Sequence, residues 1–497
     1  MKKHILPVLV MLALTLLSCR TLIPATGLLP TATIAATRQA PATPTALATT
    51  IASPLGTVVS ATQSPMPGAD GLGDEHYPTM GNGGYDALHY TLELTVDVAN
   101  NKISGTTTIE AQAKQALSSF NLDLHGLKVS AVTVNTAKAD FSRQGDELIV
   151  TPSQPLFAEE NFTVIIQYSG TPQPVSDAAF ASEKVGWYSD TGVYVFSEPS
   201  GAMGWYPVNN HPLDKATYTF RITVPKQYQV AANGLLKSED INGTMRTSVW
   251  EESYPMASYL ATLIIGRYKL VNESGPDGLP IRNYFPLDAG ADITRGFNRT
   301  SEMISYYSQV FGPYPFDVYG AAVVPMEGGI ALEDQTLSIF SNDATNEMTV
   351  AHELSHQWFG DSISLKSWKD IWLNEGFATY AEALWVEHTK GKAAADEFMR
   401  GMYNDVKEHN MAAPGNPPVG NTFSGFVYER GACTLYALRL KLGDEVFFKI
   451  LQTYYARYRY SNASTDDFIA VAETTSGQDL KGFFNDWLFS AKVPALP

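Results

Sequence analysis

The sequence predicts an α+β protein of more than one domain, in which an antiparallel β domain precedes a mainly helical domain. In the first half, apolar residues alternate with polar ones, the period of a strand with one buried face. In the second half, apolar residues recur at helical spacing. With 497 residues and 44% hydrophobic side chains, the chain is long enough for two or three domains with full cores.

Residues 1–19 have the pattern of an export signal. Two lysines precede an apolar run over residues 5–17, and Leu16-Leu17-Ser18-Cys19 resembles the bacterial lipobox. The resemblance implies that Cys19 becomes the lipidated first residue of the mature protein. We therefore expect an exported protein, lipid-anchored to a bacterial membrane, with its folded domains outside the cytoplasm. The alternative is a plain secretory signal with an incidental cysteine.

Residues 20–76 predict a disordered linker. They consist mainly of Thr, Ala, Pro, Ser and Gly, with almost no charge and no apolar periodicity. Such a segment buries too little surface to offset the entropy of ordering it. A flexible chain of this length reaches on the order of 40 Å, enough to hold a domain clear of lipid headgroups.

Residues 77–270 predict the antiparallel β domain. Turn signals such as Ser169-Gly170 and Asn242-Gly243 separate the alternating runs. The first run places Leu88, Tyr90, Leu92, Leu94, Val96 and Val98 on one face. The predicted strands cover residues 88–98, 103–111, 162–168, 218–224 and 259–268.

Residues 271–497 predict the mainly helical domain. We expect a helix over residues 292–311, short strands over 319–326 and 337–340, and helices thereafter, interrupted by a loop at 411–425. Only two cysteines occur, so no disulfide framework is expected. Cys433 lies in an apolar helical stretch and is expected to pack as a small hydrophobe.

The net charge of −17 argues against a nucleic-acid partner. Binding to phosphate backbones needs clustered Lys and Arg, which the sequence lacks.

One motif in the second half predicts a zinc hydrolase. His352-Glu353-Leu354-Ser355-His356 is followed, after eighteen residues, by Glu375. Residues four apart on a helix share one face, so both histidines can bind one ion. A catalytic zinc needs three protein ligands and an open position, and Glu375 supplies the third ligand.

The surrounding residues favour this interpretation over a chance match on an ordinary amphipathic helix. Thr345-Asn346-Glu347 is typical of a helix start, and Gly360 is expected to end the helix. A second helix, predicted over residues 373–388, would carry Glu375. Beside the ligands, Glu353 is placed to act as the base that takes a proton from the attacking water. The oxyanion needs a further donor, but spacing does not identify which tyrosine supplies it.

These motifs, followed by Phe426-Val427-Tyr428-Glu429-Arg430-Gly431-Ala432, resemble the gluzincin aminopeptidases, which include aminopeptidase N and leukotriene hydrolase. The resemblance covers residues 77–497 and implies a thermolysin-like catalytic domain with one Zn²⁺ per chain. It also implies that Tyr428 stabilises the oxyanion. Arg430 stands where the family usually has lysine.

The family holds the free amino terminus of its peptide substrates with two carboxylates. Met326-Glu327 resembles the family's Gly-x-Met-Glu-Asn segment, so Glu327 is expected to bind the amine and Met326 to line the substrate pocket. Glu198 resembles the second carboxylate. Two carboxylates facing one ammonium group form charge-assisted hydrogen bonds, which would restrict cleavage to the first peptide bond.

Three functions follow from these residues. The leading prediction is a zinc aminopeptidase acting on peptides with a free N-terminus. The alternatives are a zinc endopeptidase, which does not need the two carboxylates, and an inactive zinc-containing surface binding protein. The sequence ends where the family's catalytic domain ends, so we expect a more open cleft than in relatives with a C-terminal helical domain. Cleavage across a peptide-length series tests this expectation.

Overall fold

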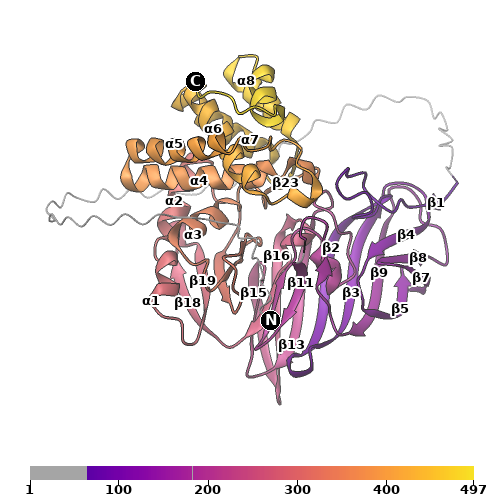
Figure 1. Cartoon of the computed structure of the whole chain (residues 1–497). Helices are drawn as coiled ribbons and strands as arrows, with labels where there is room; N and C mark the ends of the chain where they lie inside the picture. Colours follow the sequence, from indigo (N-terminus) through magenta and orange to yellow (C-terminus); the bar gives the residue numbers. More distant parts are fainter. Residues whose placement is uncertain (1–63, 182) are drawn as a thin grey trace, which may run out of the picture. The chain divides into compact units, whose positions relative to one another are not determined.

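The computed structural model describes residues 64–181 and 183–497 (Figure 1). They form a β-rich N-terminal domain followed by a mainly helical domain, so the predicted order is confirmed. Buried apolar side chains from both domains belong to one contiguous cluster. Within it, the rings of Tyr77 and Trp368 pack edge to face with their centroids 6.0 Å apart. The two domains therefore share a packed boundary.

An eight-stranded sheet forms the largest part of the N-terminal domain. In spatial order its strands are β15 (Leu235–Asn242), β16 (Met245–Met256), β13 (Ala216–Pro225), β2 (Tyr85–Asp97), β3 (Lys102–Ala113), β9 (Asn161–Gly170), β5 (Lys128–Val134) and β6 (Ala137–Lys138). Four of the predicted strands lie in it. Neighbouring strands are antiparallel except β2 and β13, which pair in parallel. The long connection between these two strands allows that pairing, which local alternation does not reveal.

Strand β2 contains a β-bulge at Leu88. Its register with β3 shifts between Ala87 and His89. Ala87, Tyr90 and Leu92 are buried, whereas Leu88 is 41% exposed. One extra residue in a strand reverses which face the following side chains occupy. The prediction that Leu88 shares the buried face is therefore wrong.

Two smaller sheets complete the domain. One contains β1 (Met66–Pro67), β4 (Leu117–Asp123), β8 (Glu147–Thr151) and β7 (Asp140–Gln144). The other contains β10 (Val175–Ser176), β11 (Lys184–Ser189), β12 (Val193–Phe196), β17 (Leu263–Gly266) and β14 (Gln229–Ala232). The strand predicted over residues 259–268 is only partly correct, because a 3-10 turn, η3 (Ser258–Leu260), precedes β17.

The second domain begins with a mixed five-stranded sheet. Its order is β18 (Tyr268–Ser274), β19 (Pro280–Pro286), β20 (Tyr319–Val324), β22 (Ser338–Ser341) and β21 (Ala331–Leu332). The three central strands are parallel and the two outer pairs antiparallel. The boundary predicted at residue 270 falls inside β18.

Helices form the rest of this domain, and Figure 1 shows α4, α5 and α6 in one layer with α3 beneath α4. The helices are α1 (Ala291–Thr294), α2 (Thr300–Val310), α3 (Glu347–Ser355), α4 (Trp372–Lys390), α5 (Lys392–Glu408), α6 (Gly425–Leu442), α7 (Asp444–Tyr458), α8 (Thr465–Ser476) and α9 (Lys481–Phe484). Strands β23 (Ile363–Leu365) and β24 (Ser461–Ala463) form a short parallel pair, which joins the segment after α3 to the segment between α7 and α8.

The helix predicted over residues 292–311 is broken into α1, a 3-10 turn and α2. Gly296 lies at the break, where its backbone approaches another segment closely. A Cβ at this position would lie 2.0 Å from the carbonyl oxygen of Thr345. This contact holds the break against the segment that leads into α3. The periodicity of apolar residues gives no sign of it.

The predicted linker is wrong over residues 64–76, which are folded onto both domains. Met66 begins strand β1, and the buried Asp74 carboxylate accepts a hydrogen bond from the backbone N–H of Trp368 at 2.9 Å. It also pairs with His211 at 3.1 Å. These specific polar contacts order a segment whose composition suggests disorder. The rest of the linker, the export signal and Cys19 lie outside the described residues.

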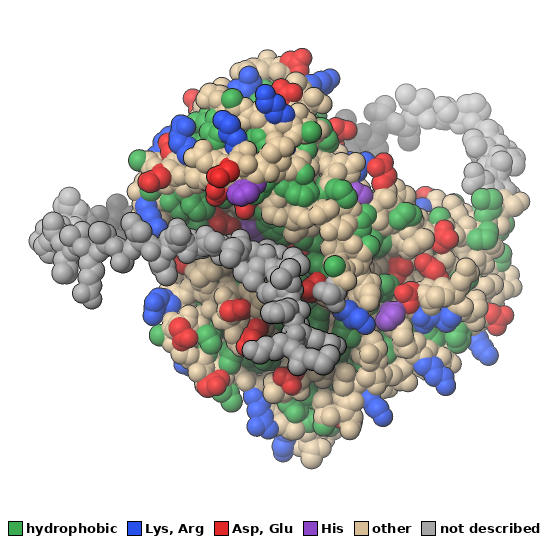
Figure 2. Space-filling model, in the orientation of Figure 1, with side chains coloured by type: hydrophobic (Ala, Val, Ile, Leu, Met, Phe, Trp, Pro, Cys, Tyr) green, Lys and Arg blue, Asp and Glu red, His purple; other side chains and the backbone are tan. Residues whose placement is uncertain are grey.

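On the face shown in Figure 2, Lys and Arg side chains are interspersed with Asp and Glu side chains. Among the helices of residues 64–181 and 183–497, none combines the length and apolar character needed to cross a bilayer.

Candidate metal centre and active site

Helix α3 brings the two motif histidines onto one face. The side-chain oxygen of Asn346 caps its start by accepting hydrogen bonds from two backbone N–H groups of the first turn, at 3.0 and 3.1 Å. The chain turns away before Gly360, whose φ of 138° favours glycine. A Cβ there would also lie 3.1 Å from Nδ1 of His356. The predicted helix start is confirmed, whereas the helix ends at Ser355, five residues before the predicted stop at Gly360.

Helix α4 brings Glu375 to the same place, and α6 brings Tyr428. The two helices approach closely at a pair of glycines. A Cβ on Gly376 would lie 2.9 Å from the Cα of Gly431. A side chain at either position would push the helices apart and separate Glu375 from Tyr428.

The geometry of His352, His356 and Glu375 fits one tetrahedral ion. Oε2 of Glu375 lies 3.3 Å from Nε2 of His352 and 3.5 Å from Nε2 of His356. Ligands bound to zinc at about 2.0–2.1 Å in tetrahedral geometry lie about 3.3–3.4 Å from one another. The three atoms converge without an intervening protein group, so these residues fit a zinc ion.

The other nitrogen of each imidazole has its own partner. Nδ1 of His352 lies 2.9 Å from Oε1 of Glu382, and Nδ1 of His356 lies 3.1 Å from the carbonyl oxygen of Phe359. Acceptors at Nδ1 hold the proton there and leave Nε2 with a free lone pair. The motif indicates the two histidines but not Glu382, which lies seven residues, about two turns, beyond Glu375 on α4.

The buried carboxylates and imidazoles shift one another's pKa values. Although burial acts to raise it, His356 and His352 lower the pKa of Glu375 to about 2. Burial raises the pKa of Glu353 to about 8, against the opposing effect of the two imidazoles. A divalent cation beside Glu353 favours its carboxylate form. The charge balance of this cluster is therefore suited to a cation.

Tyr428 lies next to the histidines. Its ring stacks on that of His352 with centroids 6.1 Å apart and planes 19° apart. Burial, Glu375 and Glu198 hold the pKa of Tyr428 well above its usual value. The hydroxyl therefore keeps its proton and can donate a hydrogen bond at neutral pH.

Two further carboxylates, Glu198 and Glu333, belong to this cluster. Glu198 follows β12 in the N-terminal domain, and Glu333 follows β21 in the helical domain. They are 6% and 2% exposed. Ligand atoms of Glu333, Glu353 and His356 all lie within 4.8 Å of one another. Burial, followed by the charge of Glu333, raises the pKa of Glu198.

The structure does not place Glu327 in this cluster, although the resemblance predicted that Glu327 would bind the substrate amine. Glu327 is exposed in the loop after β20, and Met326 packs partly buried against the neighbouring sheet. Glu333 occupies the position beside Glu353 instead. Glu333 lies six positions after Glu327, the residue that the flanking match indicated.

The residues around Glu333 carry a signal of their own. The polar triplet Glu333-Asp334-Gln335 interrupts an apolar stretch and is buried throughout. Adjacent buried acidic residues are rare outside functional sites, because each charge must be compensated.

Comparison with known proteins matches both domains. The family model described as Peptidase M1 N-terminal domain matches residues 86–260, and Peptidase family M1 domain matches residues 296–487. An M1 zinc metallopeptidase of known structure from Deinococcus radiodurans is 32% identical with a TM-score of 0.80. The match covers 86% of this chain and 98% of that one. The chain belongs to the peptidase M1 family.

More distant M1 relatives are larger. Aminopeptidase M1-B from Oryza sativa subsp. japonica is 26% identical over 82% of this chain and 50% of its own length. Human endoplasmic reticulum aminopeptidase 1 is 24% identical over 80% of this chain and 46% of its own. This chain thus spans about half the length of the curated relatives it matches. As in other M1 zinc peptidases, the cofactor is one zinc ion per chain.

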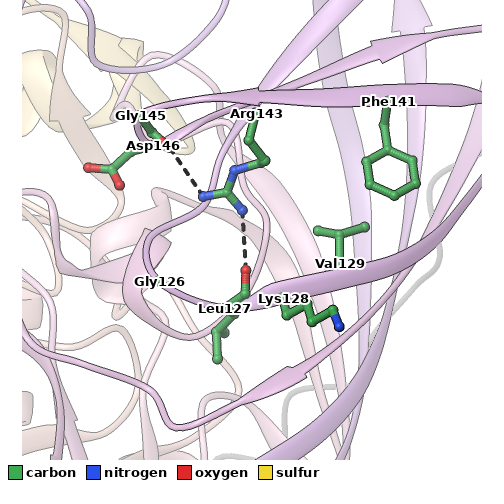
Figure 3. Close-up of a pocket in the computed structure, with 8 residues that line it drawn as sticks. All are labelled: Gly126, Leu127, Lys128, Val129, Phe141, Arg143, Gly145 and Asp146. Atoms are coloured by element: carbon green, nitrogen blue, oxygen red, sulfur yellow. Dashed lines mark hydrogen bonds between the residues drawn. The ribbon is translucent and has the colours of Figure 1, made fainter.

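The hollow shown in Figure 3 lies in the N-terminal domain and contains none of these site residues. It is lined by Leu127, Val129, Phe141, Arg143 and Asp146, among others. The guanidinium group of Arg143 donates hydrogen bonds to backbone carbonyl oxygens, including that of Leu127 at 3.3 Å. The guanidinium group is thus already paired with the backbone around the hollow.

Proposed function

We propose that this M1 peptidase is a zinc aminopeptidase that hydrolyses the N-terminal peptide bond of peptides with a free amino terminus. We call His352, His356 and Glu375 the metal group. One observation carries the proposal: Glu198 and Glu333 are buried together beside this group. Oε1 of Glu198 has no hydrogen-bond partner among the described residues. Two buried carboxylates in this position need a cation, and the α-ammonium group of a peptide supplies one that also donates hydrogen bonds.

The roles of the remaining residues follow from their positions. His352, His356 and Glu375 would hold the zinc, which when bound acts as a Lewis acid toward the scissile carbonyl. Glu353 takes a proton from the water whose oxygen attacks the carbonyl carbon. As the C–N bond breaks, Glu353 returns that proton to the leaving nitrogen. Tyr428 donates a hydrogen bond to the oxyanion that forms between these steps.

Related proteins support an activity on free N-termini. Several M1 relatives are named aminopeptidases, and a variant of the Deinococcus radiodurans enzyme was captured with a Tyr-Ser-Ala substrate. An endopeptidase would use the same metal group but would have no use for the Glu198 and Glu333 pair. An inactive binding protein would not need Glu353 and Tyr428 beside the metal group.

Replacing Glu333 or Glu198 by glutamine is expected to lower kcat/KM for free-amine substrates by about ten- to hundredfold, because each change removes a charge-assisted hydrogen bond. Steady-state kinetics on aminoacyl p-nitroanilides measures the loss. Glu327→Gln is the matched control and should leave kcat/KM unchanged, because that carboxylate is exposed outside the cluster. Loss of activity in Glu327→Gln, with none in Glu333→Gln, would restore the assignment made from the motif.

Glu382→Gln is expected to weaken zinc binding by about 10- to 100-fold, because the variant loses the carboxylate that orients His352. Competition with a chromophoric chelator measures the affinity directly. Glu397→Gln, an exposed acid-to-amide change on α5, is the control. Equal zinc affinity in both variants would mean that His352 is oriented without Glu382.

We also propose that the protein is exported and lipid-anchored through Cys19, on the strength of the lipobox resemblance. Cys19→Ser is expected to move the protein from the membrane fraction to the soluble fraction of its bacterial host. Unchanged membrane association would count against the anchor.

A further inference from the structure

The carboxylate of Glu333 is carried by a short turn between strands β21 and β22. We call residues 333–336 the anchor turn. Its four side chains are all buried. The turn lies at the boundary of the two domains, and residues from both sides bond to its backbone.

Gln357 bonds to both ends of the anchor turn. Its side-chain Nε2 donates to the carbonyl oxygen of Glu333 at 2.8 Å, and its Oε1 accepts from the backbone N–H of Thr336 at 2.9 Å. Gln357 is fully buried and directly follows His356. One side-chain amide therefore ties the turn that bears Glu333 to the helix end that bears a metal-group histidine.

The N-terminal domain holds the same turn from the other side. Nδ2 of Asn233 donates to the carbonyl oxygen of Gln335 at 2.7 Å, and the backbone N–H of Gly234 donates to Oγ1 of Thr336 at 2.7 Å. Thr336 has a φ of 67°, which is unusual for a β-branched residue. A backbone conformation of this kind persists only where its surroundings determine it. The turn is thus held in a conformation that it would not adopt on its own.

We propose that Gln357 is a positioning residue that sets the distance between the amine-binding carboxylate of Glu333 and the metal group. The inference rests on the proposed function of Glu333. The amine and the scissile carbonyl belong to the same substrate residue, so the spacing between their two binding sites must match the length of that residue. A displacement of about 1 Å in such an arrangement can reduce the rate by about 10²-fold.

A double-mutant cycle tests the proposal in the full chain. The four proteins are the wild type, Glu333→Gln, Gln357→Ala and the double variant. The readouts are kcat and KM for the best-cleaved member of a panel of aminoacyl p-nitroanilides, together with zinc content. Gln357→Ala is expected to lower kcat/KM by about ten- to hundredfold with zinc retained. Because Gln357 acts through Glu333, the double variant should be no less active than Glu333→Gln alone.

Multiplying effects in the double variant would overturn the proposal, because a general loss of stability lowers activity equally in both backgrounds. Unchanged kcat/KM in Gln357→Ala would overturn it as well. If Glu333→Gln alone leaves kcat/KM unchanged, the amine-binding role proposed for Glu333 is wrong, and this inference fails with it.

Two further variants keep the test decisive. Gln357→Glu keeps the size of the side chain and the oxygen that accepts from Thr336, but its carboxylate has no N–H to donate to the carbonyl oxygen of Glu333. This variant replaces Gln357→Ala in the cycle if the alanine variant does not fold. Asn462→Ala is the matched control. That amide also makes two hydrogen bonds to the backbone, donating to the carbonyl oxygens of Pro212 and Leu365 at 2.7 and 2.9 Å, but neither bond is to the anchor turn. Its kcat/KM should stay at the wild-type value.

Discussion

Glu353→Gln is expected to lower kcat by about 10²–10⁴-fold, the range typical of losing a general base. Glutamine has the size of glutamate but cannot accept a proton from water. The change leaves both histidines and Glu375 in place, so zinc content should remain at one ion per chain. Measuring kcat and bound metal on the same sample separates loss of the base from loss of the cofactor.

The matched control for this variant is Glu347→Gln. Glu347 lies in the first turn of the same helix, where it bonds Arg299 and Trp385 at a distance from the metal group. The Glu347→Gln variant should retain wild-type activity. Substantial turnover in Glu353→Gln with zinc bound would remove Glu353 from the role of base.

Tyr428→Phe is expected to lower kcat by about 10²–10³-fold, as removal of one oxyanion donor does elsewhere. The ring remains stacked on His352, so only the hydroxyl is lost. Because the hydrogen bond forms chiefly in the transition state, KM should change little while kcat falls. Steady-state kinetics on a single aminoacyl p-nitroanilide distinguishes the two parameters.

Tyr436→Phe on the same helix provides the comparison. Its hydroxyl bonds Asp396 at 3.2 Å, away from the metal group. A similar loss of kcat in both variants would point to a disturbed α6 rather than to an oxyanion donor. A raised KM with kcat intact in Tyr428→Phe would assign the hydroxyl to substrate binding.

The metal group could be predicted from the sequence because its determinants are local. Helical spacing aligns His352 with His356, and the cap residue Asn346 marks the start of the helix. Glu375 was identified by its distance along the chain, which is sufficient once two helices pack face to face. Tyr428 required the family resemblance, because nothing in its own spacing distinguishes it from other tyrosines.

The two carboxylates proposed to bind the amine were only partly predictable from the sequence. Glu198 lies where the resemblance indicated, whereas Glu327 was selected by a flanking match that ignores burial. Glu333 reaches the site because Gln357 and Asn233, distant in sequence, bond to the turn that carries it. Contacts of this kind leave no periodic signal.

The fold shows the same division between local and long-range effects. Alternation located four strands of the large sheet, but the parallel pairing of β2 with β13 depends on a long connection. The break at Gly296 coincides with a close approach to the backbone of Thr345. Asp74 orders residues that composition assigns to a linker, through bonds to His211 and Trp368.

The most direct test of the aminopeptidase proposal is mass spectrometry of one short peptide incubated with the full chain. The peptide is supplied free and N-acetylated in parallel, each with and without a zinc chelator. We predict stepwise loss of single N-terminal residues from the free peptide only, abolished by the chelator. Internal cleavage of both peptides would contradict the account, because it would show an endopeptidase that makes no use of Glu198 and Glu333.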